Sequence, residues 1–248
     1  MRIAAVYDIH GNLPALEAVL EDIHRANVEL IVVGGDLVPG PMPRETLECL
    51  LGLSVPVRFI QGNGEVDALA EMTGKGAERV PEQFREIVRW SADQLYPEYE
   101  QLLMSWPKTL RFEIGELGTV LFCHATPRDD NEIFTRLTPE ERLLPIFEGH
   151  NINIAICGHT HMQFDRFIGK VRVVNAGSVG MPFGEPGAYW LLLEHEIQLR
   201  HTPYDLKKAA MRIQETNYPH AQMFAANYVL QPPSEKEMLE AFSRGELK

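Results

Sequence analysis

Side chains that can bind a metal ion stand directly after five apolar runs of this sequence. These residues are Asp8, His10, Asp36, Asn63, His124, His159 and His161. Each run is typical of a buried strand, and the ligand sites of α/β proteins form in loops at the carboxyl ends of such strands. We therefore expect the five loops to meet and to bring these side chains together in one metal site.

The residue types indicate which metals such a site would bind. Imidazole and carboxylate ligands together suit iron, manganese, nickel or zinc. Asp8 and His10 are two residues apart, so one turn can present both side chains on the same side. His159 and His161 repeat this spacing, and glycines beside the ligands, such as Gly11 in the first loop, allow tight turns.

The order of these motifs is more specific than any one of them. The sequence reads DxH, GD, GN, H and GHTH along the chain, followed by NAGSVGMPF. This order resembles that of the calcineurin-like metallophosphoesterase superfamily, and in particular its small bacterial phosphodiesterase-like branch. Members of that branch usually have proline at the position of Ala176. The resemblance covers roughly residues 1–200. It implies an α/β fold in the form of a four-layer α-β-β-α sandwich with two mixed sheets and a metal site at the strand ends.

The resemblance also implies a role for each of the seven residues. Asp8, His10 and His161 would hold one metal, Asn63, His124 and His159 would hold the second, and Asp36 would bridge both. The cofactors would be two divalent ions, with manganese and iron favoured over nickel and zinc. A metal-bound hydroxide would attack phosphorus, with Asp36, Asn63 and His124 as the catalytic residues. Asn12 would support the first loop.

One position departs from the family pattern. Many members carry His after the GN motif, where it is thought to assist the leaving group, but this chain reads Gly62-Asn63-Gly64-Glu65. General acid assistance is typically worth about 10²–10⁴-fold in rate. We therefore expect a preference for diesters or activated leaving groups. Glu65 is a candidate substitute acid, water is the alternative donor, and a histidine at Gly64 is expected to raise turnover of esters with poor leaving groups.

The resemblance leaves several functions open. The favoured one is a hydrolase that cleaves phosphodiesters or nucleotide-type phosphate esters. The alternatives are a protein phosphatase, a dinucleoside polyphosphate hydrolase and a non-catalytic scaffold, because a retromer subunit of the same superfamily keeps the fold for protein binding. A scaffold should have lost ligands, whereas all seven positions are filled here, which favours the enzyme.

Other reactive residues carry weaker signals. Arg128 could bind the substrate phosphate with its forked guanidinium, although a surface ion pair explains it as well. The remaining histidines are predicted to be structural or solvated. The cysteines have no CxxC spacing, so they indicate neither a structural zinc site nor a disulfide framework. The histidines are His24, His150, His195, His201 and His220, and the cysteines are Cys49, Cys123 and Cys157.

The rest of the chain predicts the elements that position the ligands. Short β-branched runs alternate with amphipathic helices. Expected helices cover residues 16–23, 45–51 and 82–103, the last with a break at Pro97, and a charged helical tail begins at Asp205. We predict a metallophosphoesterase domain at 1–202 and a helical extension of the same domain at 203–248, used for packing or assembly. Expected strands cover residues 3–6, 30–33, 57–60, 110–114, 119–122, 152–156, 163–168, 171–174, 189–193 and 197–200.

Composition limits the partners. The 248 residues carry a net charge of -12, which disfavours stable binding to nucleic acid or anionic membranes. Two bound divalent cations would still attract a small phosphate ester. No signal peptide or membrane span is visible in the sequence, so we expect a cytoplasmic protein. The helical tail is also compatible with assembly into a homo-oligomer.

Overall fold

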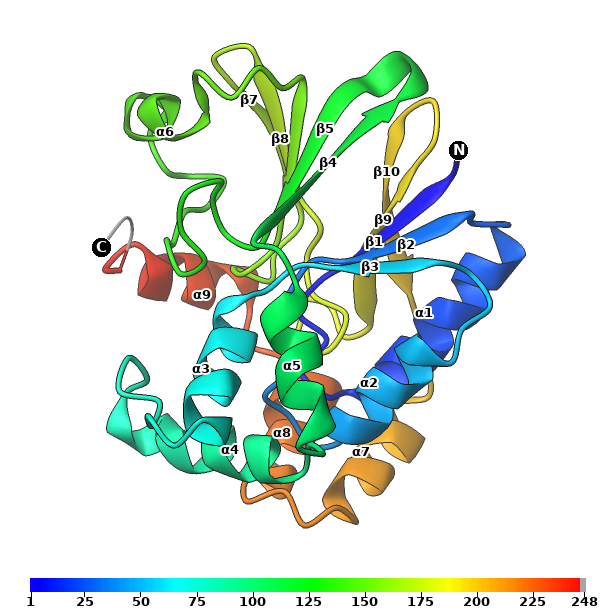
Figure 1. Cartoon of the computed structure of the whole chain (residues 1–248), viewed down its shortest axis with the longest axis vertical. Coiled ribbons are helices and arrows are strands. Elements are labelled where there is room, and N and C mark those ends of the chain that lie inside the picture. Colours follow the sequence, from blue (N-terminus) through cyan, green and yellow to red (C-terminus); the bar gives the residue numbers. More distant parts are fainter. Residues whose placement is uncertain (246–248) are drawn as a thin grey trace.

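The fold is built on two mixed five-stranded sheets (Figure 1), as seen in a computed structural model that describes residues 1–245. The first sheet has the order β10 (Ile197–Thr202), β9 (Ala188–Leu193), β1 (Ile3–Val6), β2 (Leu30–Val33) and β3 (Val57–Phe59). In this sheet β1, β2 and β3 are parallel, and β9 and β10 are antiparallel.

The second sheet has the order β4 (Thr109–Ile114), β5 (Gly118–Cys123), β6 (Ile154–Cys157), β8 (Val171–Asn175) and β7 (Phe164–Ile168). In this sheet β5, β6 and β8 are parallel and lie between antiparallel edge strands.

Strand alternation divides the core into layers. Along β1, Ile3 and Ala5 belong to a buried cluster shared with Phe122 and Ile156 of the second sheet. Their neighbours on the strand belong to a different cluster, which contains the helices of the first sheet's outer face. Because successive side chains of a strand point to opposite faces, these apolar strands are covered on both sides.

Helices cover the outer face of each sheet, which confirms the predicted four-layer sandwich. Helices α1 (Leu13–Arg25), α2 (Pro43–Leu51) and α7 (Leu206–Gln214) pack on the first sheet. Helix α6 (Glu140–Phe147) buries Leu143 and Phe147 against Cys157 and Val173 of the second sheet. Helix α6 was not predicted from the sequence, because Pro145 interrupts its helical pattern.

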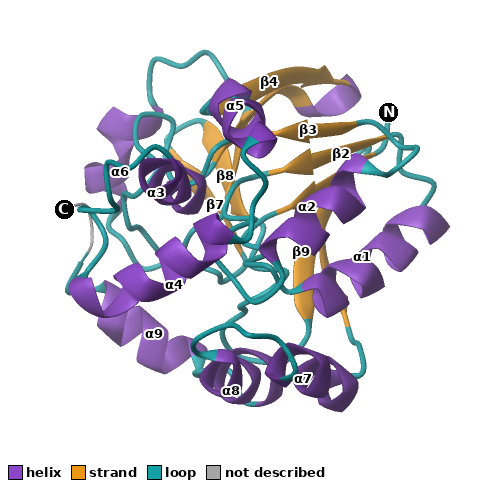
Figure 2. Ribbon diagram, turned by 60° about the horizontal axis from the view of Figure 1, so that its bottom comes forward, coloured by secondary structure: helices purple, strands orange, loops and turns teal. Residues whose placement is uncertain are grey.

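Three further helices border the strand ends. The expected break at Pro97 separates α4 (Glu82–Asp93) from α5 (Glu98–Ser105). Helix α3 (Asn63–Met72) was not predicted, and it begins at a candidate ligand. Figure 2 shows α3, α4 and α5 grouped on one side of the sheets. The strands begin and end within one or two residues of their expected positions, which is the usual scatter of element ends.

The first part of the helical tail, up to Val229, packs on the first sheet's helical layer. After α7 come α8 (Ala221–Phe224), a π-helical segment (Ala225–Leu230) and α9 (Glu235–Phe242). Ile213, Phe224 and Val229 are buried in the same cluster as β1 and α1. The division into a domain at 1–202 and an extension at 203–248 stays a prediction, which this packing supports.

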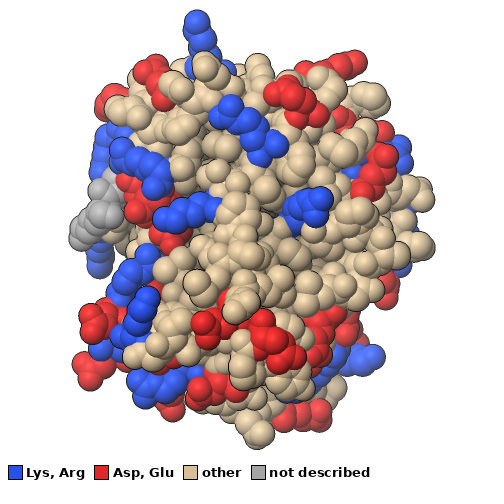
Figure 3. All heavy atoms as spheres, in the orientation of Figure 1, with Lys and Arg blue, Asp and Glu red and all other residues tan. Residues whose placement is uncertain are grey.

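The surface agrees with the acidic composition. On the face seen in Figure 3, Lys and Arg side chains are scattered, while Asp and Glu gather towards the bottom. Within residues 1–245, no helix is long and apolar enough to cross a membrane.

Candidate metal centre

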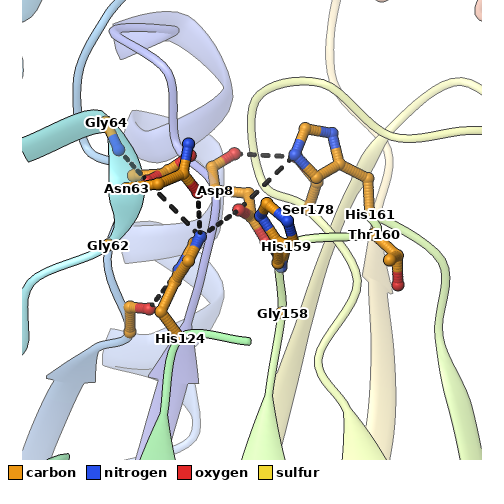
Figure 4. Close-up of polar contacts among 12 residues, drawn as sticks. Asp8, Gly62, Asn63, Gly64, His124, Gly158, His159, Thr160, His161 and Ser178 are labelled. Atoms are coloured by element: carbon orange, nitrogen blue, oxygen red, sulfur yellow. Dashed lines mark hydrogen bonds and ion pairs between the residues drawn. The ribbon is translucent and has the colours of Figure 1, made fainter. Parts of the chain in front are cut away.

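The seven candidate ligands lie together where the ends of the two sheets meet. Asp8 and His10 follow β1, Asp36 follows β2, and Asn63 opens α3 on the side of the first sheet. The three histidines of the second sheet follow β5 and β6, and they are His124, His159 and His161. Figure 4 shows Asp8 between His124 and His161. The structure thus brings all seven predicted side chains into one region.

The first group consists of Asp8, His10 and His161, whose ligand atoms lie within 4.8 Å of one another. The distance from Asp8 Oδ1 to His161 Nε2 is 3.4 Å. The Nε2 atoms of His10 and His161 are 3.2 Å apart. Three donor atoms thus point at one small volume.

The second group consists of Asp36, His124 and His159, again within 4.8 Å. Asn63 Oδ1 lies 3.0 Å from His124 Nε2 and joins this group. The two oxygens of Asp36 face different groups, because Oδ1 is 3.4 Å from His124 Nε2 and Oδ2 is 3.8 Å from His10 Nε2. Asp36 therefore stands between the two groups.

The backbone at these positions is strained. Asp8, His10, Asp36, His159 and His161 have φ angles between 48° and 65°, a left-handed conformation that is uncommon for residues other than glycine. The other non-glycine residues of the described chain with positive φ are asparagines, which tolerate this region best. Such strain persists where the surrounding structure holds it, and it concentrates at functional sites.

Carbonyl groups fix the orientation of three imidazoles. His124 Nδ1 lies 2.9 Å from the carbonyl oxygen of Gly34, and His161 Nδ1 lies 2.7 Å from that of Met181. His10 Nδ1 is 3.3 Å from the carbonyl oxygen of Pro39. A ring that donates from Nδ1 keeps Nε2 as an acceptor, so the lone pairs face the centre of the site.

The donor set fits divalent metal ions. Asp8 is fully buried, and its Oδ1 lacks a hydrogen-bond partner, whereas buried polar atoms in native proteins are nearly always paired. Burial lowers the pKa of both His10 and His159 to about 3, so these rings are neutral, as metal ligands must be. Burial raises the pKa of Asp36 to about 7, and a nearby cation would stabilise its charged form.

Glu65 holds two ligand loops together. Its carboxylate is fully buried and accepts hydrogen bonds from the backbone amides of Asp36, Leu37, Val38 and Gly62 at 2.8–3.3 Å. With both oxygens engaged by backbone donors, this side chain has no geometry for protonating a leaving group. The hypothesis that Glu65 replaces the missing acid is therefore not supported, and its role is to position the loops of Asp36 and Asn63.

Replacing Glu65 with Gln is expected to lower the free energy of unfolding by about 2 kcal/mol, because an amide nitrogen cannot accept the backbone N–H bonds that one carboxylate oxygen now accepts. Urea unfolding of the chelator-treated protein measures the change. Glu237→Gln is the matched control, since Glu237 accepts the same kind of bonds at the start of α9 but is exposed. Equal effects of the two substitutions would contradict the positioning role.

Gly64 cannot be replaced without moving the site. A Cβ atom at this position would lie 2.0 Å from the carbonyl oxygen of Val38 and 3.0 Å from Asp36 Oδ1. The Gly64 amide also donates to Asp36 Oδ1 at 2.7 Å. The sequence-based expectation that a histidine here would improve turnover is therefore corrected, because the family's imidazole has no room on this backbone.

The segment after β8 supports the first group, a role that sequence reasoning missed. Ser178 Oγ donates to the carbonyl oxygen of Asp8 at 2.7 Å, and the ring of Phe183 stacks on His161 at 5.2 Å. Asn12 donates to the carbonyl oxygen of Gly180 at 2.9 Å, in line with its predicted support of the first loop. The NAGSVGMPF motif was the available signal for these contacts.

The remaining candidates lie outside the centre. Arg128 is exposed and pairs with Glu132 at 2.5 Å, at the rim of a small hollow that includes His124. His201 stacks on Tyr189, and His195 is exposed. Cys123 and Cys157 are buried in the core.

Comparison with known proteins adds the family. A profile of the calcineurin-like phosphoesterase superfamily domain matches residues 1–196. The chain belongs to this superfamily. As a calcineurin-like phosphoesterase, it joins a family of metal-dependent hydrolases of phosphate esters, and its two clusters of candidate ligands are in keeping with that membership.

Several known proteins resemble this chain over most of their length. It is 26% identical to phosphodiesterase YfcE of Escherichia coli, over 79% of this chain and 89% of YfcE. It is 28% identical to an uncharacterised protein of Methanocaldococcus jannaschii, over 88% of this chain and 93% of that protein. The structure of a metallophosphoesterase from Sphaerobacter thermophilus matches with a TM-score of 0.72 and 26% identity, over 92% of this chain and 99% of that one.

Proposed function

We propose that this chain is a dinuclear metal-dependent phosphoesterase that hydrolyses phosphodiesters or nucleotide-type phosphate esters with water as the nucleophile. The observation that carries the proposal is the place of Asp36, whose two oxygens face two separate groups of ligands. Manganese or iron would suit these imidazole, carboxylate and amide donors ahead of nickel or zinc. The similarity to a phosphodiesterase supports the substrate class.

Each group of ligands has a distinct part in this proposal. Asp8, His10 and His161 would hold one ion, Asn63, His124 and His159 the other, and Asp36 would contact both. When bound, two divalent cations lower the pKa of water and neutralise charge on the phosphoryl oxygens. The strained loops and the carbonyls behind the histidines keep the donor atoms in place before substrate binds, so little reorganisation is needed during the reaction.

The absence of an imidazole at Gly64 supports a preference for substrates with good leaving groups. No side chain fits at this position, and Glu65, the neighbouring carboxylate, is engaged by backbone amides. The departing oxygen therefore lacks a proton donor from this segment. A phenolate needs little such help and a simple alkoxide needs a great deal.

Aryl phosphodiesters are accordingly expected to be cleaved at least about 10²-fold faster than simple alkyl phosphomonoesters. The measurement is kcat/KM of the manganese-loaded protein on bis(4-nitrophenyl) phosphate and on ethyl phosphate. Protein treated with a chelator is the control and should lose turnover of both. A preference for the alkyl monoester would contradict the assignment, since it would require a general acid elsewhere in the site.

A further inference from the structure

An apolar cavity of about 250 Å³ opens beside the first group of ligands. Its walls come from α4 and from the tail segment around α8, both of which lie at the lower end of the molecule in Figure 1. The lining residues with apolar or aromatic side chains include Phe84, Ile87, Met181, Met223, Phe224 and Tyr228.

The cavity shares a residue with the candidate metal centre. His10, a proposed ligand, forms part of its wall, and so does Pro39, whose carbonyl oxygen lies 3.3 Å from His10 Nδ1. Met181 also lines the cavity, and its carbonyl oxygen lies 2.7 Å from His161 Nδ1. A group bound in this cavity would therefore lie next to a phosphate held at the centre.

We propose that this cavity binds a flat aromatic group of the phosphate ester, either a phenyl ring or a nucleobase. The inference rests on the proposed phosphoesterase function and narrows its substrate class. An apolar cavity of about 150 Å³ is enough to bind benzene, so the larger volume here accommodates a substituted ring. Aromatic and methionine side chains on several walls offer the face and edge contacts that aromatic rings favour.

The tail gives this cavity a wall that the family domain does not supply. The superfamily profile ends at residue 196, whereas Met223, Phe224 and Tyr228 lie beyond it. From the sequence, the tail is predicted to serve packing or assembly because it carries no ligand motif. Its position beside His10 gives it a second role, the selection of substrates through their apolar part.

Isothermal titration calorimetry of the manganese-loaded protein tests the inference without turnover. Methylphosphonate and phenylphosphonate share a headgroup and differ in the ring. We expect phenylphosphonate to bind on the order of ten to one hundredfold more tightly, as burial of one aromatic ring implies. Thymidine 5′-monophosphate against ribose 5-phosphate forms a second arm, in which a similar ratio identifies a nucleobase as an occupant.

Two variants assign any preference to the cavity. Phe84→Ala removes an exposed part of the wall, and Met223→Trp fills the space from the other side. Both are expected to lower the phenyl-to-methyl affinity ratio at least about fivefold. Phe167→Ala is the matched control, because Phe167 is an exposed phenylalanine on β7, away from the cavity. This control should keep the parent ratio.

The outcomes separate the two proposals. Affinity ratios near one in both the phosphonate pair and the nucleotide pair, with tight binding of the phosphate or phosphonate headgroup, would overturn the aromatic site. The proposed phosphoesterase function would then still stand. A parent preference that persists in both folded variants would likewise overturn the assignment to this cavity. No binding of any of the four compounds to protein that holds its metal would overturn the phosphate site and the inference with it.

Discussion

Replacing Asp36 with Asn should lower phosphodiesterase turnover by at least about 10²-fold. The Asp36 carboxylate stands between the two groups of candidate ligands, with one oxygen towards His10 and the other towards His124. A neutral amide removes a negative charge that offsets two cations, and it replaces one acceptor oxygen by a donor. We therefore expect the affinity of the whole cluster for metal to fall, along with the rate.

The measurement combines kcat/KM on bis(4-nitrophenyl) phosphate with elemental analysis of the variant. Asp165→Asn is the control, because it changes the same chemical group on β7, where Asp165 forms a surface ion pair with Arg172. This control should retain turnover and metal. An Asp36→Asn variant that keeps both would show that Asp36 does not bridge.

Gly64→Ala is expected to lower the free energy of unfolding by about 3 kcal/mol. Alanine normally stabilises a helix relative to glycine by about 1 kcal/mol, so the predicted sign is opposite to helix propensity. The reason is steric, since the new Cβ would lie 2.0 Å from the carbonyl oxygen of Val38. The backbone must then move, and the bond from the Gly64 amide to Asp36 is lost. Gly64→His should fare worse and should lose metal.

Urea unfolding with matched activity assays checks this expectation. Gly52→Ala is the control, because Gly52 also has helical φ and ψ and lies at the end of a helix. A Cβ atom at Gly52 would meet no backbone atom closer than 3.3 Å. Its stability should stay within about 0.5 kcal/mol of the parent. A Gly64→Ala variant that is as stable as this control and fully active would refute the steric argument.

The sheets and the candidate ligands were accessible to sequence reasoning. The strands are short apolar runs covered on both faces, as in β1 and β6, and such runs are recognisable without tertiary information. The ligands follow them in loops, so their positions depended only on finding the strand ends. The motif order then supplied a predicted grouping of the seven residues. In space, Asp8, His10 and His161 form one cluster, and Asp36, His124 and His159 form another.

Features that arise only when distant segments of the chain pack together could not be predicted from the sequence. From the sequence, Glu65 was a candidate acid, and only the fold brings the amides of Asp36 and Leu37 to its carboxylate. The steric requirement at Gly64 arises from a carbonyl group 26 positions earlier in the chain, at Val38. The apolar cavity combines α4 with the tail around Phe224, which no local pattern relates.

A metal count tests most directly whether this centre holds two metal ions. Inductively coupled plasma mass spectrometry should find about two divalent ions per chain in protein purified without chelator or reconstituted with manganese. Asp36→Asn should reduce that number, and Asp165→Asn should not. At most one ion per chain after full reconstitution would contradict the dinuclear centre.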